Sequence, residues 1–227
     1  MMEARLASET DLAGFREEAR ALLAHQVPPD EVNWRAAHAQ NSEFFADPAA
    51  LDRRVTSKAA SAIVPASFLR LCEVVVLHHD ADRFALLYRL LWRLVHEPTL
   101  RNDPVDADML HAQQLGQAVR RDIHKMKSFV KFQTVHTPDG HALQMAWYEP
   151  THHILEAIAP WFIKRMPQQR WVIFTPERSV ECDGRQLHFA PGLERGSGLT
   201  PEAPEAAWLE SHQKIFGERA IAVSPMQ

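Results

Sequence analysis

The sequence predicts an α+β protein in which helices pack on a small antiparallel sheet built from hairpins. Its first half carries helical patterns of apolar residues, and its second half mixes short strand patterns with further helices. This order of elements is typical of α+β proteins, because strands that follow one another closely pair as antiparallel hairpins. Hydrophobic residues make up 46% of the 227, enough for the chain to bury a proper core.

The length allows one large domain or two small ones, and we expect a single domain over residues 1–227. Segment 30–60 is weakly patterned, so irregular structure is expected there, with Phe44 and Phe45 as residues that dock on the core. In the alternative organisation, residues 1–60 form a loosely attached N-terminal helical part.

The composition argues against membrane and disulfide-rich proteins. No stretch reaches the ~18 consecutive apolar residues of a membrane span, and no apolar signal-peptide core follows Met1. We therefore expect a cytoplasmic protein with no membrane partner. Its two cysteines, Cys72 and Cys182, lie far apart and outside any Cys-x-x-Cys motif, which argues against a disulfide framework or a cysteine-based zinc site.

Two helices are predicted before residue 80. The first begins at Thr10 or Asp11 and ends before Val27, because the proline that follows Val27 pushes this residue out of the α region. The second begins at Pro65, although the valine run at 74–76 taken alone would suit a strand. Its inward side chains are predicted to be Phe68, Leu71, Cys72 and Val75.

A third helix is predicted over residues 81–97. Asp80 would cap its start and Pro98 would stop it. Its apolar content on nearly all sides indicates a central helix. Three arginines of this helix are left without an assigned role: Arg83, Arg89 and Arg93.

Two hairpins and one further strand are predicted in the second half. Segments 129–135 and 142–148 read as strands, and residues 137–140 between them are turn residues, since proline fixes φ and glycine accepts a positive φ. Segment 180–189 is a second hairpin with an Asp-Gly turn. A short, fully apolar strand is predicted over 171–175.

Two more helices accompany these strands. Thr151 is predicted to cap one that ends at Pro167, with a kink at Pro160. A loop over 191–204, rich in glycine and proline, precedes a last helix over 205–215.

The helix before the first hairpin carries a cationic face. Its apolar positions 115, 119, 123 and 126 recur at helical spacing, so this face should be buried. Arg120, His124 and Lys127 fall in one stripe on the opposite side, and only Asp122 offsets the cations. The whole chain has a net charge of -4, so this local reversal of sign is what would draw a phosphate backbone to one face.

The hairpin adds aromatic rings to these cations. If Phe129, Lys131 and Gln133 share a face with Trp147 or Tyr148, cation and π-surface lie together, the combination that holds an unstacked base beside its phosphate. In the alternative, the cations form a solvated face and the aromatics pack on the core. The candidate nucleic-acid-binding residues are Arg120, Arg121, His124, Lys125, Lys127, Lys131, Trp147 and Tyr148.

An enzyme is the second class considered. The candidate catalytic residues are His124, Glu149, His152 and His153. Imidazole and carboxylate suit zinc, iron or manganese, but His152 and His153 would point about 100° apart on a helix and so could not easily bind one ion. No His-Glu-x-x-His, Gly-x-Ser-x-Gly or glycine-rich phosphate loop occurs. We therefore predict no metal and no cofactor.

Several strings in the chain carry a family resemblance. They lie at 15–16, 21–23, 27–29, 83–84, 87–93, 121–132, 147–150, 152–154, 160–162 and 171–176. Together they resemble a bacterial family of unknown biochemical function labelled "probable DNA metabolism protein". Its members are found N-terminal to a uracil-DNA glycosylase domain or beside a radical SAM protein assigned to DNA repair. The resemblance implies a DNA context and these two partners, and supplies no catalytic residue. It also implies that this chain is a fragment, since family members continue past its last residue.

The sequence thus predicts a DNA-associated accessory module of a repair or modification system, which binds nucleic acid through a basic helix and an aromatic hairpin. The alternatives are a metal- or histidine-dependent DNA repair enzyme and a docking module for the glycosylase or radical SAM partner. A pocket into which His124, Glu149 and a neighbouring histidine converge would favour the enzyme. A flat apolar patch around Trp161 or Trp208 would favour the docking module.

Overall fold

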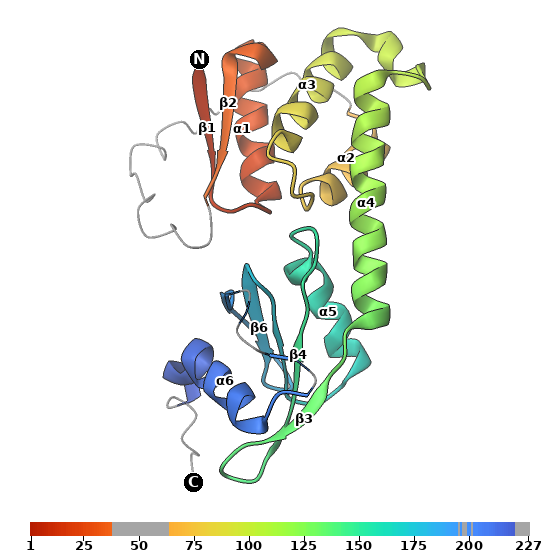
Figure 1. The fold of residues 1–227 in the computed structure, drawn as a ribbon. Coiled ribbons are helices and arrows are strands. Elements are labelled where there is room, and N and C mark those ends of the chain that lie inside the picture. The colour runs from red at the N-terminus through yellow and green to blue at the C-terminus, as the bar shows by residue number, and fades with distance from the viewer. Residues whose placement is uncertain (38–63, 195, 197–198, 201, 221–227) are drawn as a thin grey trace. The chain divides into compact units, whose positions relative to one another are not determined.

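The computed structural model describes residues 1–37, 64–194, 196, 199–200 and 202–220. Phe44 and Phe45 lie outside these residues. The chain divides into two compact units, Met1–Arg121 and Asp122–Gln227 (Figure 1). Compact units are not the same as independently folding domains, so the single domain stays a prediction. The predicted α+β class is confirmed, since helices accompany a mostly antiparallel sheet.

The first unit contains a parallel pair of strands that the sequence analysis missed. β1 (Met2–Leu6) and β2 (Val32–Ala36) pair in parallel, and α1 (Leu12–Ala24) with the short 3₁₀ helix η1 (Pro29–Glu31) connects them. Parallel neighbours need such a crossover and carry no hairpin turn, so no local turn signal marks them. The predicted start of α1 is confirmed, and the Asp11 carboxylate caps the helix by accepting the N–H of Gly14 at 2.8 Å.

The other helices of the first unit are α2 (Ala66–Val75), α3 (Arg83–His96), the 3₁₀ helix η4 (Pro98–Asn102) and the first part of α4 (Ala107–Phe129). The prediction of a helix at α2 is confirmed, with the four predicted side chains buried. The predicted start of α3 is wrong by two residues. Asp80 accepts the N–H of Asp82 at 2.9 Å in a turn before the helix and does not cap α3 itself.

Arg83 has a structural role that the sequence did not suggest. Its side chain is 2% exposed, and its Nη2 lies 2.7 Å from a carboxylate oxygen of Glu9. Its guanidinium also donates to the backbone carbonyls of Val76 and Asp80. A buried charge is tolerated only with such a set of partners. Arg83 therefore ties the start of α3 to the end of α2 at Val76 and to the turn between β1 and α1 at Glu9.

The second unit is built on one five-stranded sheet with the order β3-β4-β5-β6-β7. Its strands are β3 (Gln133–His136), β4 (Ala142–Trp147), β5 (Trp171–Phe174), β6 (Arg178–Cys182) and β7 (Leu187–Pro191). Three neighbouring pairs are antiparallel hairpins, whereas β4 and β5 are parallel because the helix α5 (Leu155–Arg165) connects them. Both predicted turns are confirmed, with φ of 82° at Gly140 and 99° at Gly184.

Helices cover both faces of this sheet (Figure 1). On one face Phe162 of α5 lies 5.9 Å from Trp171, measured between ring centroids. On the other, α6 (Glu205–Ala220) contributes Trp208 and Phe216 to a core with Phe174. All four residues of β5 are therefore buried, as its apolar sequence predicts.

Two boundaries in the second unit correct the predictions. α4 continues to Phe129, so the strand predicted from residue 129 begins only at Gln133. Thr151 does not cap a helix, because α5 begins at Leu155 and the N–H of Thr151 binds the Asp122 carboxylate. None of the helices within the described residues is both long and apolar enough to cross a membrane.

Candidate nucleic-acid interface

The last turn of α4 and the start of the first hairpin bring Lys131 together with Phe129 and Trp147. Leu115, Val119 and Met126 are buried as predicted, whereas Ile123 of the same face is only half-buried. Lys125 is exposed on the opposite side. Phe129, the last helical residue, has 68% of its surface exposed, which is unusual for an aromatic side chain.

A hollow of about 130 Å³, here called the aromatic hollow, opens beside this segment. Its lining residues are Phe129, Lys131, Phe132, Gln133, Trp147, Leu199 and Trp208. Trp208 is 2% exposed, so it belongs to the core and forms part of the wall. The hollow thus gathers Phe129, Lys131 and Gln133 with Trp147, which is the juxtaposition that a stacked base beside its phosphate would need. Tyr148 is not among its lining residues.

The strand register explains this arrangement. In the antiparallel pair β3–β4, Gln133 lies opposite Met145. Lys131 lies two residues before the start of β3. If the same register is continued to it, Lys131 lies opposite Trp147. Residues i and i+2 of a strand share a face, so Trp147 follows Met145 onto the face covered by α6. Trp147 is half-buried there, with part of its surface packed on the core and part at the hollow.

Lys127 is directed elsewhere. Its Nζ lies 5.2 Å from the ring centroid of Trp161, which belongs to α5. A cation over the face of an indole ring is attracted by the negative charge density of that face. Lys127 is therefore held toward α5, whereas Lys131 lies at the hollow lined by α6. The structure separates these two lysines, which the sequence analysis grouped.

Asp122 is buried and binds the loop before α5. The residue is 5% exposed, and one of its carboxylate oxygens accepts the backbone N–H groups of Thr151 at 2.8 Å and His152 at 2.9 Å. These bonds stabilise the loop before α5. Among the described residues, no acid forms an ion pair with Lys125 or Lys131.

The remaining sequence candidates have varied surroundings. His124 and Glu149 are exposed, His152 is buried, and Nδ1 of His153 lies 2.6 Å from a carboxylate oxygen of Glu177. None of the four lines the aromatic hollow. The last two candidates, Arg120 and Arg121, are exposed residues of the first unit.

Tyr148 continues the β4 backbone without reaching the hollow. Its N–H donates to the carbonyl of Phe174 at 3.0 Å. Burial raises the pKa of Tyr148, and the negative charge of Asp122 adds to this shift. The phenol is therefore protonated at neutral pH and remains a hydrogen-bond donor.

Sequence reasoning missed two partners at this site. Trp208 comes from the last helix and Leu199 from the loop before it, both remote in sequence from the hairpin. No local pattern signals that they would meet Trp147. Their pairing depends on α6 packing across the β3–β5 face of the sheet.

The second unit is, by fold and site, a small α+β module that presents lysine beside aromatic rings. A family model described as a domain of unknown function, DUF4130, matches residues 81–217, which is more than half of the chain. The protein therefore belongs to the DUF4130 family. The match runs from just before α3 into α6 and includes every residue of the aromatic hollow. Neither the curated proteins nor the solved structures that were searched contain a match to this chain.

Proposed function

We propose that this protein is a DNA-associated accessory module of a repair or modification system and that it binds single-stranded nucleic acid. One unstacked base would enter the aromatic hollow and stack against Phe129 or Trp147. Lys131 and Lys125 would contact the phosphates on either side. The observation that carries this proposal is the gathering of Phe129, Lys131 and Trp147 around one hollow.

The size of the hollow favours a single planar group. Its volume of about 130 Å³ is well below the ~300–1,000 Å³ of pockets that enclose a whole small molecule. An aromatic face contributes about 1–3 kcal/mol per stacked base and accepts any base. Bases inside a duplex are already stacked, so the hollow suits single strands or locally opened ones.

The DNA context rests on the family resemblance of the sequence. Relatives that stand next to a uracil-DNA glycosylase domain or a radical SAM repair protein support a role beside such partners in the cytoplasm. The histidine-dependent enzyme has less support, because its candidate residues and the aromatic hollow do not overlap. The docking module has less support as well, since Trp208 is buried and Trp161 lies beneath the Lys127 ammonium.

Phe129→Ala tests the proposal with little risk to the fold, because the side chain is largely exposed. Fluorescence anisotropy with a labelled single strand should show an affinity roughly fivefold to a hundredfold lower than wild type. Val105→Ala is the matched control, since Val105 is an apolar residue of the first unit that is 74% exposed. Wild-type protein that fails to bind the single strand, or a Phe129 variant that binds as well as the control, would contradict the proposal.

A further inference from the structure

The first unit contains a separate and larger hollow of about 500 Å³, here called the arginine hollow. Buried side chains of Phe68, Leu71 and Leu94 line it from α2 and α3. Three arginines also line it, and they come from three elements: Arg70 from α2, Arg101 from η4 and Arg120 from α4. Its volume lies within the ~300–1,000 Å³ typical of small-ligand sites.

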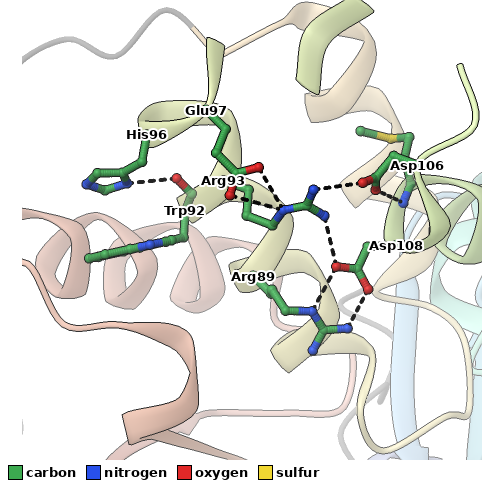
Figure 2. Close-up of polar contacts among 8 residues, drawn as sticks. Arg89, Trp92, Arg93, His96, Glu97, Asp106 and Asp108 are labelled. Carbon is green, nitrogen blue, oxygen red and sulfur yellow. Dashed lines mark hydrogen bonds and ion pairs between the residues drawn. The ribbon is translucent and has the colours of Figure 1, made fainter. Parts of the chain in front are cut away.

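Two acids at the start of α4, Asp106 just before it and Asp108 in its first turn, do not neutralise these arginines. Asp106 lies 2.7 Å from Nη2 of Arg93, and Asp108 lies 2.7 Å from Nη2 of Arg89 (Figure 2). Arg93 also reaches Asp108 at 3.1 Å and Glu97 at 3.2 Å. These hydrogen bonds hold the pKa of both aspartates below its usual range. The two carboxylates are therefore matched by arginines of α3.

The charge that remains at the arginine hollow is positive. Among the described residues that line it, Asp103 is the one acid, and Oδ1 of that carboxylate accepts the N–H of Val105 at 3.0 Å. Within the described part of the chain, neither Arg70 nor Arg120 has a hydrogen-bond or ion-pair partner. Arg101 does have an interaction partner, so Arg70 and Arg120 are the arginines available to a ligand. Two guanidinium groups thus face an apolar-walled space without a counter-charge of their own.

Gly116 lies between Leu71 and Arg120. A Cβ atom at this position would lie 3.2 Å from Cδ1 of Leu71 and 3.6 Å from Nη1 of Arg120. The first distance is tight and the second is an ordinary van der Waals contact. The missing side chain therefore lets α2 approach α4 closely at Leu71, and the Arg120 guanidinium lies beside this contact.

We propose that the arginine hollow binds a phosphomonoester of nucleotide size. Arg70 and Arg120 would hold the phosphate, because the planar guanidinium donates paired hydrogen bonds that match phosphate oxygens. The nucleoside would lie against Phe68 and Leu94, with the Gln113 amide available for hydrogen bonds. This proposal is independent of the nucleic-acid interface, since the two hollows share no residue.

Calorimetric titration of the full chain tests the proposal with three probes: 2′-deoxyadenosine 5′-monophosphate, deoxyadenosine and inorganic phosphate. The nucleotide should bind more tightly than either of its parts. It should also raise the melting temperature, because a ligand that binds only the folded state stabilises it. Arg70→Gln and Arg120→Gln should each weaken nucleotide binding about tenfold or more, because each removes a charge-assisted contact. Arg20→Gln, at an exposed arginine of α1, is the matched control and should change nothing.

Asp103→Asn gives an effect of opposite sign. The amide oxygen can still accept the N–H of Val105, so the local turn should persist. The substitution removes the one negative charge of the lining, and nucleotide binding should become a few times tighter. Unchanged or weaker binding would contradict an anion site.

The phosphate could belong to the end of a strand or to a free nucleotide. Two oligonucleotides that differ only in having a 5′-phosphate or a 5′-hydroxyl end distinguish these ligands. Tighter binding of the phosphorylated strand that is lost in Arg120→Gln supports the site and assigns it to strand ends. Equal binding of both strands, with the mononucleotide still bound, supports the site and assigns it to free nucleotides. No nucleotide binding, binding no tighter than inorganic phosphate, or unaltered binding by both arginine variants would overturn the proposal.

Discussion

Two groups of cations in this chain look alike in sequence and differ in their surroundings. Arg89 and Arg93 of α3 each contact carboxylates, as Figure 2 shows. Lys125 and Lys131 have no acidic partner among the described residues, and Lys131 lies at a hollow with Trp147. A neighbouring acid, which the charge pattern alone does not reveal, therefore separates a structural cation from one available to a ligand.

The largest expected effect is a loss of stability when an arginine of the paired group, Arg89 and Arg93, is removed. Arg93→Ala leaves the Asp106 carboxylate, whose side chain is 9% exposed, without its arginine. We expect a loss of about 1–3 kcal/mol, a range that applies when a buried charged group loses its hydrogen-bond partner. Thermal melting should show a decrease of several degrees, while single-strand affinity stays at the wild-type value. Lower single-strand affinity with an unchanged melting temperature would contradict the structural role of Arg93.

The next effect is on single-strand binding at the aromatic hollow, where Lys131 of the unpaired group, Lys125 and Lys131, lies beside Trp147. Trp147→Leu and Trp147→Phe remove similar volumes from a half-buried site, but only phenylalanine keeps a face for stacking. We expect about a tenfold loss of single-strand affinity for leucine and little loss for phenylalanine. Melting curves should lie close together for the two variants. Equal affinities would indicate that Trp147 serves only the core.

Much of the local structure was predictable from the sequence, and the site was predictable in part. The turns at Gly140 and Gly184 and the buried face of α2 depend on neighbouring residues, so short-range patterns suffice. The β1–β2 pair and the position of Trp208 depend on contacts between distant segments. The contacts of Asp122 with the loop before α5 could not be predicted either, because a helical wheel does not indicate which backbone N–H groups will approach a carboxylate.

A smaller effect is expected in the salt dependence. Each phosphate contact contributes about 0.7 to the slope of log affinity against log salt for single strands. Lys125→Ala combined with Lys131→Ala should therefore flatten the slope by about 1.4. Lys127→Ala should have less influence, because that ammonium lies over the Trp161 ring. Anisotropy titrations at several salt concentrations would measure both, and an effect confined to Lys127 would contradict the separation of the lysines.

The smallest effect concerns acid stability at the paired group. The pKa of Asp106 and that of Asp108 are lowered by their arginine partners in the folded state. A carboxyl group whose pKa is lower in the folded state contributes stability at pH values above its unfolded-state pKa, which is near 4. This contribution is lost as the pH falls through the folded-state pKa. The melting difference between wild type and Arg93→Ala should therefore shrink below about pH 4. A difference that stays constant down to pH 2 would contradict the ion-pair explanation.

The central claim, that a base enters the aromatic hollow, is tested most directly by photocrosslinking. A single strand that contains 5-bromouracil would be irradiated with the full chain, and mass spectrometry would locate the crosslinked residues. We expect crosslinks at Phe129 or Trp147, lost in the presence of excess unmodified strand. Efficient crosslinking confined to residues outside the hollow, or none at a concentration where the strand binds, would contradict the claim.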